Sequence, residues 1–211
     1  MDTVILLPGI YLPATSLLPL ARRLRRAGFH PLRLGYPALR RSPADNATNL
    51  ARRFATLDAG VIHYVGHSLG GLVLRHLLAG HSQALPPGRC VTLGTPHRGS
   101  AVARALQRRR LGWMLGASRC RGLLGGLPDW PPERELGSLA GIRGVGVGRL
   151  LAALEPPHDG TVAADETRCP GMSDHAVVAC THTGLLFAPT VARQTVHFLR
   201  HGRFLLAPSV E

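Results

Sequence analysis

The stretch VIHYVGHSLGGLVLRHLL, residues 61–78, decides the fold. It begins as a short run of branched and apolar residues, breaks at a serine flanked by glycines, and continues as a longer apolar run. The short run predicts a buried strand and the longer one a buried helix. Glycines at 66 and 70 let the backbone turn sharply between them. The stretch therefore predicts a strand, a tight turn and a helix, with the Ser68 hydroxyl projecting from the turn.

Strand and helix patterns alternate along the rest of the chain. A weak strand signal lies near 140–148, and clearer runs predict strands at 3–7, 30–36, 90–94 and 175–180. Helices are predicted to begin at Ser16, at Asp45 or Asn46, and at Pro189. The second of these helices carries apolar residues at helical spacing as far as Leu57. This alternation predicts an α/β fold, with a mostly parallel sheet and helices on both of its faces.

Length and composition predict one folded domain over residues 1–211. Hydrophobic residues make up 45% of the 211 residues and charged residues 18%, which is typical of a globular protein. Residues 98–140 mix helix-forming pieces with glycine, tryptophan and proline. We expect any cap or lid to be small and to come from this region.

The formal net charge is +13, and all 25 basic residues are arginine. A surface selected to bind phosphate normally includes lysine, so we attribute the excess mainly to a bias of the source genome and predict no nucleic-acid partner. The start of the chain lacks the basic n-region of a signal peptide. Its apolar runs are too short to span a membrane. We therefore expect a cytoplasmic protein without integral membrane association.

The chain has four cysteines, at positions 90, 120, 169 and 180. Their spacing matches neither a C-x-x-C pair nor a metal site with histidine, so no metal is predicted. Buried free thiols are the preferred interpretation. A disulfide between Cys169 and Cys180 is the alternative if the protein is exported.

A serine at a strand–turn–helix junction matches the G-x-S-x-G setting of a nucleophile, but the hydroxyl needs a base. His182 directly follows the last predicted strand, where a loop at the carboxyl edge of the sheet can direct an imidazole towards Ser68. His175 lies at the opposite end of that strand and is the weaker candidate. His67 is next to Ser68 in sequence, but adjacent residues on such a turn are expected to point apart.

The base in turn needs an acid to orient it. Asp159 stands in PPHDGTV, a loop flanked by proline and glycine that is suited to neither helix nor sheet. Rival carboxylates, more typical of a solvated surface, are Asp129, Asp165, Glu166 and Asp174. The predicted catalytic residues are thus Ser68, Asp159 and His182, in the chain order expected for this architecture.

An oxyanion hole requires two backbone donors close to the serine. The Leu69 N–H follows Ser68 and comes with the helix. The second donor is expected from the loop after the first strand, LLPGIYLP, at Ile10 or alternatively at Tyr11. Gly9 would allow that loop to approach closely.

These residues resemble the α/β-hydrolase family of lipase-like serine esterases. VGHSLGG resembles its nucleophile turn, and LGTPHRGS (93–100), HDGTV and THTGLLF resemble loops of small bacterial lipases and GPI-inositol-deacylase-like proteins. The resemblance runs from about residue 3 to 200. It implies acyl transfer through Ser68, His182 and Asp159, with no metal or cofactor. The family usually has His-Gly after the first strand, whereas this chain has Pro8-Gly9.

The resemblance implies a small-molecule or lipid ester as substrate. Lipase, esterase and thioesterase cannot be separated by these residues, since one triad serves all three. Apolar candidates for lining the substrate pocket are Tyr11, Leu12, Trp113, Met114 and Trp130. The alternative, which is the more common role of such residues, is that they pack the helices together. Two alternatives stand beside the enzyme: a hydrolase scaffold weakened by Pro8, and an anion-binding module for nucleic acid or membrane, motivated by the charge.

Overall fold

A computed structural model describes residues 1–54, 60–146 and 148–205. Its centre is a six-stranded sheet in the order β2-β1-β3-β4-β5-β6, in which every neighbouring pair of strands is parallel. The strands are β1 (Thr3–Leu7), β2 (His30–Arg33), β3 (Ile62–His67), β4 (Cys90–Leu93), β5 (Leu136–Gly141) and β6 (Asp174–Val178). This arrangement confirms the predicted α/β fold with a parallel sheet.

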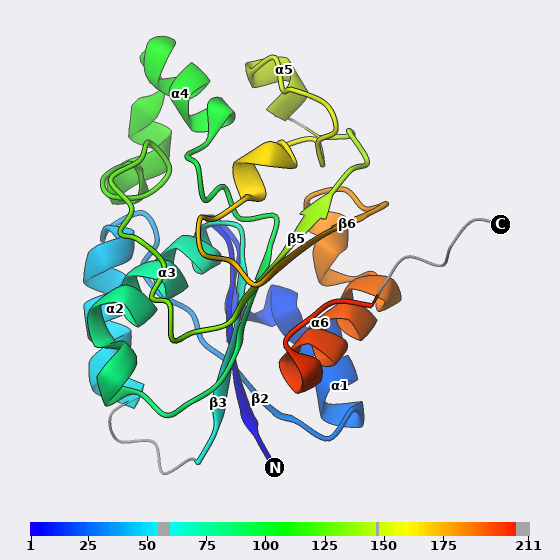
Figure 1. Ribbon diagram of the computed structural model, residues 1–211. Coiled ribbons are helices and arrows are strands. Elements are labelled where there is room, and N and C mark those ends of the chain that lie inside the picture. The colour runs from blue at the N-terminus through cyan, green and yellow to red at the C-terminus, as the bar shows by residue number, and fades with distance from the viewer. Residues whose placement is uncertain (55–59, 147, 206–211) are drawn as a thin grey trace, which may run out of the picture.

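Helices cover both faces of the sheet, as predicted. α2 and α3 lie on one face, and α1 and α6 lie on the other (Figure 1). The helices are α1 (Leu18–Arg26), α2 (Pro43–Phe54), α3 (Leu69–His81), α4 (Ala101–Arg108), α5 (Gly148–Leu151) and α6 (Pro189–His201). Short 3₁₀ turns are η1 (Ala14–Leu17), η2 (Ser82–Ala84), η3 (Gly112–Arg119), η4 (Asp165–Thr167) and η5 (Thr183–Leu186).

The two core layers follow from the alternation of side chains along the strands. In β1, Val4 and Leu6 pack towards α1 and α6, whereas Ile5 and Leu7 pack towards α2 and α3. All four side chains are fully buried, because helices cover both faces of a parallel sheet. α3 is buried from Leu69 to Leu78, as its continuous apolar sequence predicts.

Two helix starts differ from the prediction. Ser16 belongs to η1, where its hydroxyl donates to Pro13 O at 2.8 Å, and α1 begins after it at Leu18. α2 begins earlier than predicted, at Pro43. Its start is fixed by Ser42, whose Oγ accepts from Asp45 N at 3.2 Å and donates to the Asp45 carboxylate at 2.6 Å. Leu57, predicted on the same helix, lies outside the described residues.

Strand β5 (Leu136–Gly141) lies earlier than the predicted 140–148. Its sequence, LGSLAG, has low strand propensity because small residues dominate it. The packing explains one of them: a Cβ at Gly137 would lie 2.6 Å from the Phe198 ring on α6. Small residues therefore make room for the helix that covers the strand.

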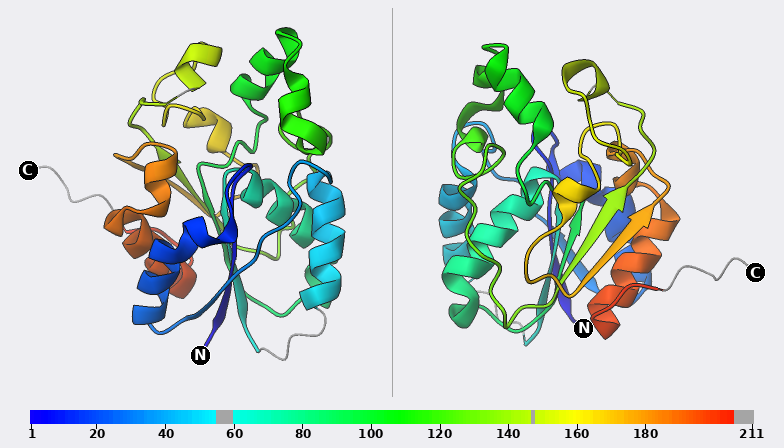
Figure 2. Two further views of the ribbon diagram at one scale, coloured as in Figure 1. Left: turned by 180° about the vertical axis from the view of Figure 1, so that it is seen from behind. Right: turned by 45° about the horizontal axis from the view of Figure 1, so that its top comes forward.

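Part of the region predicted as a cap, 98–140, lies above the carboxyl edge of the sheet. Figures 1 and 2 show α4 there, with α5 beside it. Ala103 and Leu106 of α4 and Leu115 of η3 pack with Leu69 and Leu72 at the start of α3. This part of the region is thus anchored to the domain by its own apolar cluster.

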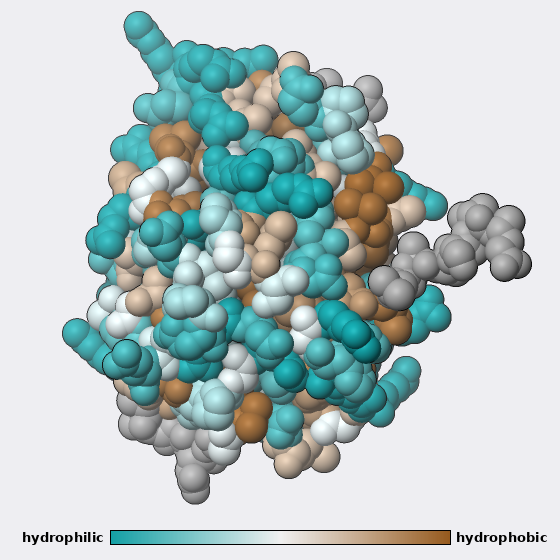
Figure 3. Space-filling view, in the orientation of Figure 1, coloured by the Kyte–Doolittle hydropathy of each residue, from teal (hydrophilic) through white to brown (hydrophobic). Residues whose placement is uncertain are grey.

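The surface is mainly hydrophilic in the view of Figure 3, where apolar side chains form separate areas. Within the described ranges, no helix combines the length and the apolar character that crossing a membrane would require.

All four cysteines are free thiols, so the alternative disulfide between Cys169 and Cys180 is absent from this structure. Cys90 and Cys169 are buried, as predicted. Cys120 is exposed and Cys180 is half-buried, so the expectation that every thiol is buried was wrong for these two. Both lie in connecting segments, although Cys180 still packs against the edge of the core on the side of α1 and α6.

Candidate active site

Ser68 lies between β3 and α3, in a backbone conformation that few residues other than glycine adopt. Its φ is 52° and its ψ is −122°. The peptide groups around it hold this conformation: Ser68 N donates to Leu93 O at 2.8 Å, and Thr95 Oγ1 donates to Ser68 O at 2.9 Å. The surrounding structure thus fixes a strained turn that presents the hydroxyl at the carboxyl edge of the sheet.

A close backbone approach requires the glycine at position 70. A Cβ there would lie 2.5 Å from Leu7 O and 2.7 Å from Pro8 O. The first turn of α3 therefore lies directly against the end of β1. This contact brings the loop after β1 to the serine turn.

His182 and Asp159 form a hydrogen-bonded pair. His182 Nδ1 lies 2.6 Å from Asp159 Oδ2. Because a carboxylate only accepts, Nδ1 carries the proton and Nε2 is left as the basic nitrogen. Asp159 is 1% exposed, and its other oxygen, Oδ1, accepts from Thr161 N at 2.9 Å and Val162 N at 2.7 Å. Hydrogen bonds therefore hold both oxygens of the Asp159 carboxylate in place.

The pair lies over the end of β4, the strand next to β3. A Cβ at Gly94 would be 3.0 Å from His182 Nδ1 and 3.1 Å from Asp159 Oδ2. The described residues contain no hydrogen bond between the Ser68 hydroxyl and His182. The structure thus joins the predicted base and acid, and it places them at the strand end beside the predicted nucleophile.

His67 also reaches His182. Its Nε2 donates to the backbone carbonyl of His182 at 3.0 Å, and the two ring centroids lie 4.7 Å apart. His67 is buried, which lowers its pKa to about 3, and the charge of His182 acts in the same direction. Sequence reasoning dismissed this residue because neighbours on a sharp turn were expected to point apart. The missing information was the path of the 180–183 loop.

The loop after β1 forms a tight turn beside Ser68. Leu12 N donates to Gly9 O at 3.3 Å, and Tyr11 has a φ of 63°. A Cβ at Gly9 would lie 3.0 Å from His67 Nδ1 and 3.1 Å from Ser68 Cβ, so glycine at this position eases the close approach of the loop to the serine turn. Within the described ranges, Ile10 N–H donates to no other residue. It is therefore free to bind an external acceptor.

Pro8 is held in this loop despite its departure from the family pattern. Its carbonyl accepts from the hydroxyl of the half-buried Tyr36 at 2.7 Å. Burial raises the pKa of Tyr36, so the phenol stays protonated and continues to donate. The Tyr36 hydrogen bond anchors the loop at the residue where the resemblance departs.

Of the five predicted pocket residues, Tyr11 and Leu12 line a cavity of about 330 Å³, together with Tyr36 and the segment 37–40. The Tyr11 hydroxyl donates to the Met114 carbonyl, which ties η3 to the same region. Trp113 is 71% exposed. Trp130 is buried in the core on the α3 side, with its indole N–H donating to Arg134 O.

The rival groups have other partners. Asp165 pairs with Arg98 at 2.8 Å on the surface. Glu166 accepts from Ala101 N and Ala163 N, and burial raises its pKa. Asp174 accepts from Phe204 N, and His175 Nε2 lies 2.8 Å from the Thr167 hydroxyl. In the described part of the chain, no three or more His, Cys, Asp or Glu side chains gather as metal ligands would.

Comparisons with protein-family models and with curated proteins find no match. Solved structures do match. A lipase of Bacillus licheniformis in its mature form aligns with 95% of this chain and 91% of its own, at 18% identity and a TM-score of 0.72. The chain has the α/β-hydrolase fold.

Other proteins with the α/β-hydrolase fold align over much of the chain. A metagenomic carboxyl esterase is 19% identical, with a TM-score of 0.67 over 86% of this chain and 64% of its own. A type II thioesterase from the borrelidin biosynthetic cluster is 17% identical, with a TM-score of 0.64 over 94% and 91%. Against the propeptide form of the Bacillus lipase, this chain spans 51% of the length. At these identities the likeness concerns the fold.

Proposed function

We propose that this protein is a serine hydrolase that cleaves carboxylic esters through Ser68, His182 and Asp159. The observation that carries the proposal is the 2.6 Å contact between His182 Nδ1 and the buried, doubly hydrogen-bonded Asp159 carboxylate, at the strand end next to Ser68. A surface histidine has no need of such an arrangement. A general base held in one tautomer does.

In the proposed reaction, Ser68 Oγ attacks the ester carbonyl carbon while His182 Nε2 takes the hydroxyl proton. The imidazolium returns that proton to the leaving alcohol as the carbon–oxygen bond breaks, and an acyl-enzyme remains. Water, activated by the same nitrogen, then releases the acid and restores the serine. The first step requires Ser68 Oγ and His182 Nε2 to come within hydrogen-bond distance when substrate binds.

The N–H groups of Leu69 and Ile10 are the proposed oxyanion donors. Leu69 is the first residue of α3, whose N-terminus favours developing negative charge. The Ile10 N–H has no internal acceptor among the described residues and lies in the loop that Gly9 brings against Ser68. Two such donors would stabilise the tetrahedral intermediate at the serine.

The substrate class follows less directly. The cavity beside Tyr11 and Leu12 is apolar enough for an acyl or aromatic group. The aligned structures include a lipase, a carboxyl esterase and a thioesterase, so a thioester is the second candidate substrate. We also propose that the enzyme belongs to the lipase-like branch, that residues 1–211 form a single domain, and that the protein is cytoplasmic.

A series of p-nitrophenyl esters from acetate to palmitate tests the function. We expect hydrolysis by the wild type and none above background by Ser68→Ala. A rate that falls steeply beyond butyrate would identify an esterase, whereas a rate that is sustained to palmitate would identify a lipase. Hydrolysis of a matched series of thioesters, at higher rates than the oxygen esters, would identify a thioesterase. A folded wild type that hydrolyses none of these substrates would favour the alternative of a weakened scaffold.

A further inference from the structure

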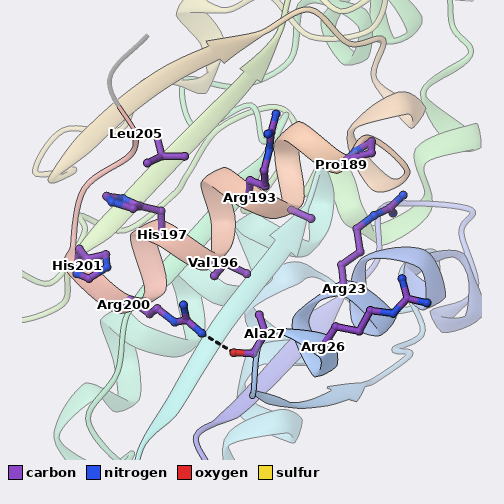
Figure 4. Close-up of a pocket in the computed structure, with 11 residues that line it drawn as sticks. Arg23, Arg26, Ala27, Pro189, Arg193, Val196, His197, Arg200, His201 and Leu205 are labelled. Carbon is purple, nitrogen blue, oxygen red and sulfur yellow. Dashed lines mark hydrogen bonds between the residues drawn. The ribbon is translucent and has the colours of Figure 1, made fainter. Parts of the chain in front are cut away.

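A second cavity lies on the face of the sheet covered by α1 and α6. It is an open groove of about 510 Å³ between these two helices (Figure 4). Its floor includes Ala27, Ala192, Val196 and Leu205, all apolar. This volume is within the range of small-molecule sites, about 300–1,000 Å³.

The walls of the groove are cationic. Arg23 and Arg26 extend from α1, and Arg193, His197 and Arg200 extend from α6; in the view of Figure 4, Arg200 points towards α1 and Arg193 points away from it. Neither helix contains a single Asp or Glu. In the described ranges, the arginine–carboxylate ion pairs involve arginines outside the groove, namely Arg89, Arg98, Arg104 and Arg168.

Two of the four groove arginines, which are Arg23, Arg26, Arg193 and Arg200, already donate a hydrogen bond. Arg23 Nη1 donates to Pro19 O within α1 at 3.4 Å. Arg200 Nη2 donates to Ala27 O at the end of α1, at 2.5 Å, and its guanidinium lies 5.8 Å from the Phe29 ring. This contact bridges the two helices and sets the width of the groove. The guanidinium groups of Arg26 and Arg193 form no ion pair or hydrogen bond with another described residue, so none of the described carboxylates neutralises their charge.

We propose that this groove binds an amphiphile with a single chain and an anionic headgroup. The guanidinium groups of Arg23, Arg26 and Arg193 would bind a carboxylate or phosphate head through charge-assisted hydrogen bonds. The apolar floor would cover the chain, which gains free energy when it leaves water. An inorganic anion would leave the floor unused, and a neutral lipid would leave the arginines unpaired. The site is separate from Ser68 and does not depend on the proposed hydrolysis.

Calorimetric titration with monomeric dodecyl phosphate tests the proposal. We expect saturable binding of one molecule per chain, and none of butyl phosphate or of neutral dodecyl maltoside. The double variant Arg26→Gln/Arg193→Gln should weaken binding by about tenfold or more. The matched double variant Arg52→Gln/Arg108→Gln removes the same charge at exposed positions on α2 and α4 and should bind as the wild type does. Dodecanoate in place of the phosphate distinguishes the two headgroups.

Three results would overturn the proposal. Binding that is equally weakened in both double variants would reflect net charge alone. Binding that is unaffected by Arg26→Gln/Arg193→Gln would place the amphiphile elsewhere, for example in the cavity beside Tyr11. Absence of monomer binding, with the protein instead sedimenting with phosphatidylglycerol vesicles, would assign the face to an anionic membrane surface. Because none of these measurements uses ester hydrolysis, their outcome is independent of the triad.

Discussion

The imidazole of His67 lies 4.7 Å from that of His182, and its Nε2–H donates to the His182 carbonyl at 3.0 Å. His67 therefore holds the backbone of the residue that is paired with Asp159. Because burial keeps His67 neutral, it adds no positive charge beside an imidazolium formed at His182. Because His67 directly precedes Ser68 in the sequence, its hydrogen bond also connects the serine turn to the loop that carries His182.

Removing this hydrogen bond should impair the reaction. We expect His67→Leu to lower kcat/KM by about fivefold, because a hydrogen bond contributes about 1 kcal/mol to positioning. His67→Gln places an amide N–H at a similar reach and should recover most of the loss. A purely structural role predicts instead that both variants lose melting temperature and activity together, without rescue by glutamine. Steady-state kinetics with thermal melts distinguishes the two.

Asp159→Asn should lower kcat by about 10⁴-fold, because an amide facing His182 Nδ1 favours the wrong tautomer. The asparagine oxygen can still accept from Thr161 and Val162, so the melting temperature should change little. Asp165→Asn is the matched control, since that carboxylate lies on the surface beside Arg98. Full activity in Asp159→Asn would place the acid elsewhere.

The positive φ of Ser68 makes a prediction about stability. Glycine adopts this conformation without strain, so we expect Ser68→Gly to be more stable than Ser68→Ala by about 1 kcal/mol in chemical denaturation. At Ser16, whose backbone lies in a 3₁₀ turn, the order should reverse, with alanine more stable than glycine. If Ser68→Ala proves at least as stable as Ser68→Gly, the turn is unstrained.

Acid should destabilise the fold. Burial lowers the pKa of both His67 and His97 to about 3, below the value of about 6.5 in an unfolded chain. Between these values the unfolded state binds more protons, so stability is complete above about pH 6.5 and is lost as the pH falls towards 3. The raised pKa of Glu166 acts in the opposite direction. We expect a lower melting temperature at about pH 5 than at about pH 7.5. The corresponding loss in the free energy of unfolding is on the order of 2 kcal/mol per histidine.

A variant assigns this effect. His97→Gln should flatten the dependence of melting temperature on pH, because it removes one of the buried imidazoles whose pKa is lowered. A melting temperature that is constant between about pH 7.5 and pH 5 would contradict the neutral state of both histidines.

The sequence predicted the parts of the fold whose residues act locally. Strands β1, β3 and β4 are short apolar runs buried on both faces. The serine turn lies where a strand pattern ends and a helix pattern begins. β5 was predicted too far along the chain because its residues are small. Gly137 has no room for a side chain beside Phe198, a residue far along the chain on α6. Such a strand has no signal of its own.

The site shows the same division. Loop position was sufficient to select Asp159 and His182 as partners, and the structure joins them. The sequence left two interpretations of Trp130 open, because an aromatic residue in a loop looks the same whether it lines a cavity or enters the core; the structure buries it in the core. His67 was missed because its partner is the carbonyl of a residue 115 positions away. Contacts between loops are set by topology, which local patterns do not encode.

The central claim, an activated Ser68, is tested most directly by intact-mass analysis after treatment with a fluorophosphonate. The reagent needs no assumption about the ester, because it reports only the nucleophilicity of the serine. The account predicts a single adduct on the wild type and none on Ser68→Ala, with Asp159→Asn labelled far more slowly. A folded wild type that gains no adduct, or an adduct that persists in Ser68→Ala, would contradict it.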